Sequence, residues 1–117
     1  ILGYALYTRV TVVGNAVVPS AALTVMAVRE DRRRLGVGER LVRHGLERCR
    51  GLGIQIVFAA GLPQFFERIG FRPAVPLGLK PDWPVPEGQY TAFDLSGTKL
   101  GQIQGTVHYP VNFNNIV

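Results

Sequence analysis

Residues 22–60 of this 117-residue chain read ALTVMAVREDRRRLGVGERLVRHGLERCRGLGIQIVFAA, and this stretch decides the fold. It begins with one continuous apolar run, Ala22–Val28, and ends with another, Ile54–Ala60, and such runs are typical of strands buried on both faces. Between them, apolar residues recur at helical spacing over positions 37–52, and glycines follow. The order strand, helix, strand predicts a βαβ unit with parallel strands and a right-handed crossover.

Further elements are expected on both sides of this unit. Gly3–Val13 is rich in β-branched and aromatic residues and predicts a strand. Pro63 and Gly70 are typical of the start and the end of a short helix. Five of the eight prolines lie in residues 73–88, which predicts a loop there. The late strands that we expect are Gln89–Leu95 and Gly105–Phe113.

The composition indicates one folded domain. Hydrophobic residues make up 47% of the chain and charged residues 18%, which supports a packed core. We expect a cytoplasmic protein, because there is one cysteine, Cys49, no signal peptide and no apolar run long enough to cross a membrane. We expect no metal site, because His44 and His108 lack metal-ligand spacing. The chain begins with Ile1 inside a predicted strand, so we expect a segment upstream of it.

The positive charge is concentrated in one region. The net charge is +5, and residues 29–50 contain eight arginines and four acidic residues. A local excess of this kind indicates one anionic partner, either a phosphate-bearing cofactor or a nucleic acid. The nucleic acid is disfavoured, because aromatic residues do not alternate with the arginines and no recognition motif is present.

Two glycines stand where the predicted helix begins. The first amides of a helix have no internal partner and lie at the positive end of its dipole, so Gly36 and Gly38 could bring them close to an anion. Arg33 and Arg34 add charge beside this turn. An ordinary helix start is the alternative. A dinucleotide fingerprint would need a third glycine where Leu41 stands, and the Walker motif is absent.

Two motifs resemble the signatures of the GNAT superfamily of N-acetyltransferases. Arg33-x-x-Gly36-x-Gly38 follows the strand that ends in MAV, and GLPQFFERIGFRP (Gly61–Pro73) is similar to the second signature. The tail is similar to the YhbS-like group of that superfamily. The resemblance implies an α/β fold: a mixed, twisted sheet whose central parallel strands splay apart, with one crossover helix and one short helix.

The resemblance also implies a cofactor site within a single acetyl-CoA-binding domain, residues 1–117. Acetyl-CoA would lie between the splayed strands, and its pantetheine arm would pair with the backbone of one of them. The amides of the glycine turn would hold the pyrophosphate, and the side chain of Arg33 would close over it. The residues implied for the pantetheine are Met26, Ala27 and Val28, and those for the pyrophosphate are Arg34, Leu35, Gly36, Val37 and Gly38.

The catalytic acid and base are not identified by the sequence. Many relatives have a tyrosine five residues before the Phe of the Gly-Phe pair, where this chain has Phe66. Water or the acceptor amine could protonate the thiolate, or Tyr90 or Tyr109 could reach it, or the chain could bind the cofactor without efficient transfer. His108 is interpreted as a structural residue rather than a base.

The resulting functional hypothesis is an N-acetyltransferase that moves an acetyl group from acetyl-CoA to a primary amine of a small molecule or protein. The alternative is a non-catalytic or weakly catalytic acyl-CoA-binding module. We expect neither a nucleic acid nor a membrane as partner. A free strand edge would allow a second copy to pair, so a homodimer is one expected assembly.

Overall fold

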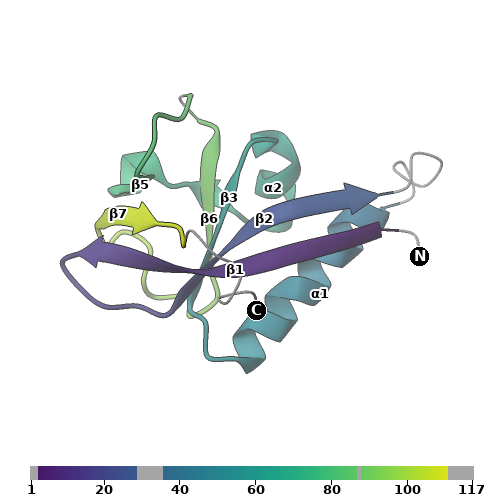
Figure 1. Cartoon of the computed structure of the whole chain (residues 1–117), viewed down its shortest axis with the longest axis horizontal. Helices are drawn as coiled ribbons and strands as arrows, with labels where there is room; N and C mark the ends of the chain where they lie inside the picture. Colours follow the sequence, from purple (N-terminus) through teal and green to yellow (C-terminus); the bar gives the residue numbers. More distant parts are fainter. Residues whose placement is uncertain (1–2, 29–35, 87, 111–117) are drawn as a thin grey trace.

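The computed structural model describes residues 3–28, 36–86 and 88–110, and these form one curled sheet with two helices (Figure 1). Seven strands are arranged in the order β4-β6-β3-β2-β1-β7-β5. The elements are β1 (Gly3–Gly14), β2 (Ser20–Val28), α1 (Val37–Gly51), β3 (Ile56–Ala60), α2 (Pro63–Ile69), β4 (Arg72–Pro73), the 3-10 helix η2 (Val75–Leu77), β5 (Leu79–Pro81), β6 (Tyr90–Asp94) and β7 (Gly105–His108).

The predicted βαβ unit is confirmed. Strands β2 and β3 are parallel, and α1 connects them. Strand β1 runs antiparallel to β2, and β6 runs antiparallel to β3, so the two parallel strands form the centre of a mixed sheet. The predicted α/β architecture with a crossover helix and a short helix is therefore correct.

The prediction of a plain loop over residues 73–88 is wrong in part. That segment contains η2 and the short strand β5, which pairs in parallel with β7 through Leu79↔Gly105 and Pro81↔Val107. Prolines are tolerated there because β5 is the last strand of the sheet, where one side needs no ladder hydrogen bonds. The predicted late strand from Gly105 is correct as far as His108, and its expected end at Phe113 lies outside the described residues.

The sheet separates two cores, because successive side chains of a strand point to opposite faces. On β3, Val57 and Ala59 pack on the face covered by α1 and α2, which we call the helical face. Ile56 and Phe58 point to the other face, which we call the inner face. The sheet curls around the inner face, because side chains from β1, β2, β3, β5, β6 and β7 meet in that second core.

Helix α1 lies very close to β1. The hydroxyl of Tyr7 donates a hydrogen bond of 3.0 Å to the carbonyl oxygen of Val42, and its ring packs against the backbone at Gly45. A Cβ atom at position 45 would lie 2.1 Å from the Tyr7 ring, so only glycine allows this approach. This contact fixes where the first turn of α1 stands relative to the sheet. No helix in the described ranges is long and apolar enough to cross a membrane.

Candidate functional site

The two central strands separate at their carboxyl ends. Their ladder holds four pairs and ends at Leu23↔Ala59. Strand β2 continues to Val28 but pairs there only with β1, while β3 ends at Ala60, which pairs with Tyr90 of β6. Figure 1 shows β2 and β3 diverging beyond this point. We call the opening between these two strands the split. Along it, the side of β2 that faces β3 has no strand partner within the described residues.

A β-bulge lies where the split begins. Leu6 pairs with Val25 and Tyr7 pairs with Leu23, so Thr24 is an extra residue on β2. Its hydroxyl lies 3.1 Å from the hydroxyl of Thr8 and donates to the carbonyl oxygen of Leu6 at 3.2 Å. A bulge turns the backbone of its strand locally and is common beside active sites. The bulge therefore reorients the β2 backbone as it leaves β3.

The first turn of α1 stands near the end of β2. Gly36 precedes the helix with φ of 74° and ψ of 13°, a left-handed conformation that favours glycine, and the amide of Arg40 donates to its carbonyl oxygen at 3.1 Å. A Cβ atom at Gly36 would meet nothing within 4 Å among the described residues. Val37, at the start of α1, lines a small cavity together with Gly3 of β1. Gly3 pairs with Val28, the last residue of β2, so the start of α1 lies beside the end of β2.

The sequence-predicted cofactor residues fall into three groups. The backbone of Met26, Ala27 and Val28 lies on β2 beyond the last pair with β3, opposite Ala5, Tyr4 and Gly3 of β1. Gly36, Val37 and Gly38 form the start of α1, with Val37 buried and Gly38 half-buried. The other predicted residues, Arg33, Arg34 and Leu35, lie outside the described residues.

Phe66 belongs to the core of the helical face. Its side chain is 3% exposed. Its ring packs edge-on against the ring of Phe65, with centroids 5.1 Å apart, and against the ring of Phe71, with centroids 5.0 Å apart. Ile69, one turn further along α2, is buried in the same core. Phe66 is thus an apolar packing residue of this core.

The inner face contains a second aromatic cluster, made of Trp83, Tyr90 and Tyr109. The two tyrosine hydroxyls lie 2.9 Å apart. The Trp83 ring packs against the Tyr109 ring with centroids 4.7 Å apart and against the Tyr90 ring at 6.5 Å. Burial, reinforced by Tyr109, raises the pKa of Tyr90, and burial likewise raises the pKa of Tyr109 to about 12. Both phenols are therefore protonated at neutral pH.

An acid–histidine pair lies beside this cluster and could not be predicted from sequence. Nδ1 of His108 lies 3.1 Å from Oδ2 of Asp82, and both side chains are almost half exposed. The two residues are 26 positions apart, and only the parallel pairing of β5 with β7 brings them together. His108 pairs with Thr11 of β1, a strand that does not border the split. The structure therefore gives His108 a polar partner but does not place it between β2 and β3.

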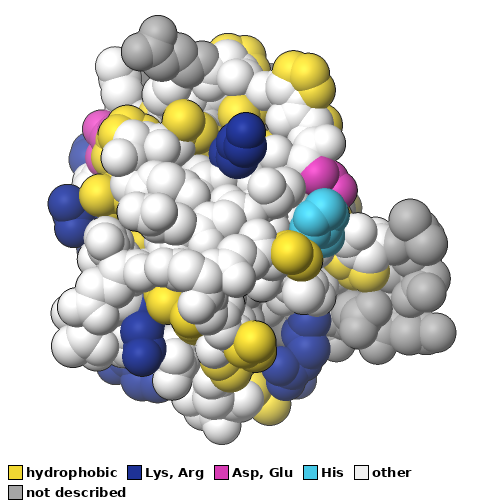
Figure 2. All heavy atoms as spheres, turned by 90° about the vertical axis from the view of Figure 1, so that its left-hand side faces the viewer, with side chains coloured by type: hydrophobic (Ala, Val, Ile, Leu, Met, Phe, Trp, Pro, Cys, Tyr) yellow, Lys and Arg dark blue, Asp and Glu magenta, His cyan; other side chains and the backbone are white. Residues whose placement is uncertain are grey.

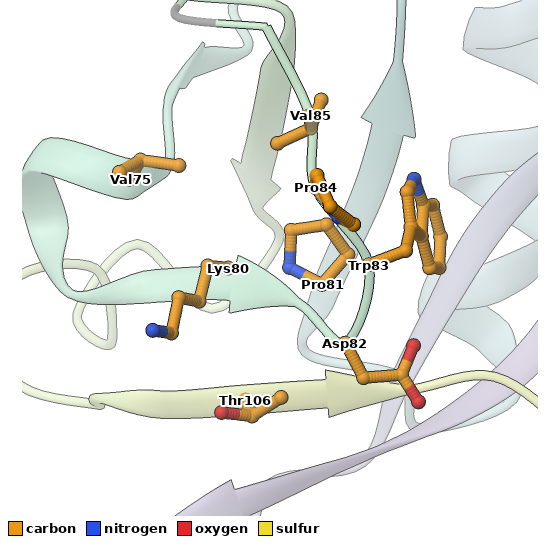
Figure 3. A pocket seen from close by; sticks show the side chains of 8 residues that line it. All are labelled: Val75, Lys80, Pro81, Asp82, Trp83, Pro84, Val85 and Thr106. Carbon is orange, nitrogen blue, oxygen red and sulfur yellow. The ribbon is translucent and has the colours of Figure 1, made fainter.

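One cavity lies at the far edge of the sheet from α2. It has a volume of about 540 Å³ and lies along β5 and the loop that follows (Figure 3). Trp83 projects from that loop to the side opposite Val75 and Lys80, so its indole faces away from most of the lining. The cavity is thus a shallow surface hollow, separate from the split. Its lining residues are Val75, Lys80, Pro81, Asp82, Trp83, Pro84, Val85 and Thr106.

Some charged side chains of α1 form ion pairs along the helix. On α1, Arg43 pairs with Glu39 at 3.3 Å and Arg50 pairs with Glu47 at 3.5 Å. On the face drawn in Figure 2, Lys and Arg side chains lie in separate places among apolar and neutral atoms. No group of three or more His, Cys, Asp or Glu side chains that could hold a metal ion occurs in the described ranges.

Comparison with known proteins agrees with this geometry. The family model described as "Acetyltransferase (GNAT) domain" matches residues 3–74. YjhQ of Escherichia coli (strain K12), an uncharacterised N-acetyltransferase, is 38% identical over 88 residues, which cover 74% of this chain and 49% of YjhQ.

Two solved structures have the same fold. The GNAT family N-acetyltransferase YhbS from Escherichia coli, in complex with CoA, superposes with a TM-score of 0.86 and 28% identity, over 94% of this chain and 61% of YhbS. A GNAT family acetyltransferase from Brucella melitensis, in complex with acetyl-CoA, gives a TM-score of 0.68 and 24% identity, over 94% of this chain and 59% of that protein.

The chain thus spans about half to three fifths of the length of these relatives. The family match covers more than half of the chain, and the splayed parallel strands, the bulge and the glycine turn occur together in one sheet. The chain belongs to the GNAT acetyltransferase family.

Proposed function

We propose that this chain binds acetyl-CoA in the split and transfers the acetyl group to a primary amine of a small molecule or protein. One observation carries the proposal: β2 leaves β3 after Leu23↔Ala59 and runs on for five residues with its β3-facing backbone free of any described strand partner. Unpaired backbone groups need hydrogen-bond partners. The amides of a pantetheine arm would pair with Met26, Ala27 and Val28.

The start of α1 would hold the pyrophosphate. Backbone amides from Arg34 to Gly38 would donate to the phosphate oxygens at the positive end of the helix dipole, and the side chain of Arg33 would add charge. No atom of the described residues would lie within 4 Å of a Cβ at Gly36, which is consistent with a ligand at this turn. The relative YhbS, which has the same fold and binds CoA, supports this assignment.

Transfer requires a polarised thioester carbonyl and a stabilised leaving group. We infer that a backbone N–H of Ala27 or Val28 donates to the carbonyl oxygen, because a donor fixed in advance stabilises the charge that develops there. The bulge at Thr24 turns the β2 backbone just before these residues. The amine proton would pass to solvent.

A second candidate function, acyl-CoA binding without efficient transfer, is favoured by Phe66. The ring is buried among other apolar side chains and has no proton to give. Thiol release from acetyl-CoA in the presence of a panel of primary amines separates the two candidates. Release above the rate without protein for any amine supports the transferase, and saturable binding without release for the whole panel supports the binding module.

The cofactor site is tested with two matched glycine variants. Gly36 and Gly53 flank α1 at opposite ends, have φ of 74° and 80°, and have open space around them. Gly36→Ala and Gly53→Ala should therefore cost similar stability, roughly 1 kcal/mol each. In calorimetric titrations with acetyl-CoA at two salt concentrations, only Gly36→Ala should weaken binding, by tenfold or more. Equal weakening by both variants, or no binding by the unmodified chain, would refute the site.

A further inference from the structure

The carboxyl ends of β5 and β7 are joined by an acid–histidine pair. Asp82 directly follows β5, and His108 is the last residue of β7. The ladder between these parallel strands ends at Pro81↔Val107, so Asp82 and His108 are the next pair in register. Nδ1 of His108 lies 3.1 Å from Oδ2 of Asp82. A side-chain contact therefore continues the pairing of the two strands beyond their last backbone pair.

The next residue of each segment turns to the inner face. Trp83 follows Asp82, and Tyr109 follows His108. The rings of Trp83 and Tyr109 pack with centroids 4.7 Å apart, and the Tyr109 hydroxyl lies 2.9 Å from that of Tyr90. Tyr109 also packs against the core of the inner face. The acid–histidine pair and the ring contact thus join the same two segments, one residue apart, so loss of the pair would loosen the attachment of Trp83.

Few other contacts hold the segment Asp82–Pro86, which we call the Trp83 segment. Two of its residues are prolines, which have no backbone N–H to donate. The backbone of residues 83–85 forms no hydrogen bond with any described residue. Val85 packs against the inner core, while Trp83 is 41% exposed. The position of the Trp83 segment therefore depends on a small number of side-chain contacts.

The contact between Asp82 and His108 is of a kind whose strength depends on pH. Histidine is the side chain that changes charge between about pH 5 and 8, whereas carboxylates stay ionised over that range. A protonated imidazole has an N–H at both ring nitrogens and a positive charge, so it forms a charge-assisted hydrogen bond with a carboxylate. A neutral imidazole has one N–H and no charge. The contact should therefore be stronger at the acidic end of this range.

We propose that Asp82 and His108 form a pH-dependent clasp, which holds the Trp83 segment on Tyr109 when His108 is protonated and releases it more often when His108 is neutral. The side chains of His108 and Asp82 are 46% and 41% exposed, so protons reach them from solvent. An ion pair this exposed changes an equilibrium by only a few fold, which gives a graded response. The Trp83 segment also lines the cavity of Figure 3, so its release would reshape that cavity.

Other charged or titratable groups lie around the clasp. Arg9 of β1 lines the same small surface hollow as His108, and Lys80 of β5 lines the neighbouring cavity. Arginine and lysine side chains stay protonated between about pH 5 and 8. Burial raises the pKa of Tyr109 to about 12 and also raises the pKa of Tyr90, so both phenols stay neutral. Among these described groups, His108 is the one whose type changes charge in this range.

The test uses the fluorescence of Trp83, the single tryptophan of the chain. Its quenching by acrylamide is measured from lifetimes, which removes the direct effect of a nearby imidazolium on the emission. In the unmodified chain without cofactor, the quenching rate constant should be about twofold larger at about pH 8 than at about pH 5.5. His108→Gln and Asp82→Asn keep polar side chains but lose the ion pair. Their rate constants should be equal at both pH values and close to that of the unmodified chain at the higher pH.

His44→Gln is the matched control, because His44 is the only other histidine of the chain and lies exposed on α1. This variant should keep the twofold response, and thermal unfolding at both pH values checks that every variant is folded. A quenching rate constant that does not change with pH in the unmodified chain would overturn the clasp. A pH response that survives in His108→Gln, or one that disappears in His44→Gln, would overturn it as well. Because the measurement uses no cofactor, its outcome is independent of whether the chain binds acetyl-CoA.

Discussion

Replacing Gly45 with alanine tests whether α1 is positioned by its contact with Tyr7. A Cβ atom at this site would lie 2.1 Å from Cε1, 2.4 Å from Cζ and 2.6 Å from Oη of Tyr7. The Tyr7 ring is 5% exposed, and its hydroxyl is bonded to Val42, so the ring has little room to move. Either the helix or the tyrosine has to shift.

The expected loss of folding stability in Gly45→Ala follows from three contributions. Alanine in place of glycine inside a helix favours folding by about 1 kcal/mol. Overpacking a core costs about 1–3 kcal/mol, and breaking the Tyr7–Val42 hydrogen bond costs about 1 kcal/mol. The net destabilisation is therefore about 1–3 kcal/mol, which corresponds to a fall in Tm of roughly 4–12 °C for a domain of this size.

The assay is thermal and urea unfolding of Gly45→Ala beside Gly51→Ala. Gly51 is the last residue of the same helix, and a Cβ atom there meets nothing within 4 Å, so Gly51→Ala should be neutral or slightly stabilising. Tyr7→Ala should remove the clash, and the double variant Tyr7→Ala/Gly45→Ala should show a coupling free energy of about 1–3 kcal/mol. If Gly45→Ala is as stable as Gly51→Ala, the close approach of α1 to β1 is refuted.

Three further predictions follow from buried or hydrogen-bonded groups. Burial opposes ionisation of Asp94, but hydrogen bonds from Ser96 and from the amides of residues 97, 99 and 100 outweigh it and lower the pKa of Asp94 in the folded protein. The ionised carboxylate therefore stabilises the fold at pH values above the pKa of an aspartate in the unfolded chain. The difference in Tm between the unmodified chain and Asp94→Asn should be large at neutral pH and shrink as the pH falls through the lowered pKa; a constant difference would contradict this. Burial raises the pKa of Cys49 to about 11, so a thiol reagent at pH 8 should label it only when the protein unfolds, and rapid labelling of the folded chain would show that the site is open. Phe66→Tyr would bury a hydroxyl in an apolar core and should lower stability by about 1–3 kcal/mol without raising thiol release from acetyl-CoA, whereas a large gain in release would place this position in the active site.

The central unit of the fold could be predicted because local patterns are strong there. Strands β2 and β3 form where the two apolar runs were expected, but the first run, Ala22–Val28, contributes only Ala22 and Leu23 to their four-pair ladder. Thr24 and Ala27 are exposed, so the expectation that this run is buried on both faces is wrong. The helical spacing over residues 37–52 matched α1 to within one residue. Gly36 was identified from its place in a motif, and its φ of 74° supplies a physical reason for glycine at that position.

The loop over residues 73–88 shows where local patterns fail. Its prolines indicate irregular structure, yet Leu79–Pro81 forms β5 because β7 offers a parallel partner more than twenty residues later. Pairing over that distance depends on the curl of the sheet and leaves no periodic signal in the three residues themselves.

The sequence by itself determined the family motifs, the βαβ unit and the glycine turn, because each depends on residues that are close together in the chain. Only the tertiary structure decided that Phe66 packs in the core of the helical face, that Asp82 meets His108, and that the Tyr90 and Tyr109 hydroxyls meet on the inner face. The physical reason is that a side chain's burial and partners are set by which strands the sheet brings together. Spacing along one strand or helix shows the face to which a residue points, but not what it meets there.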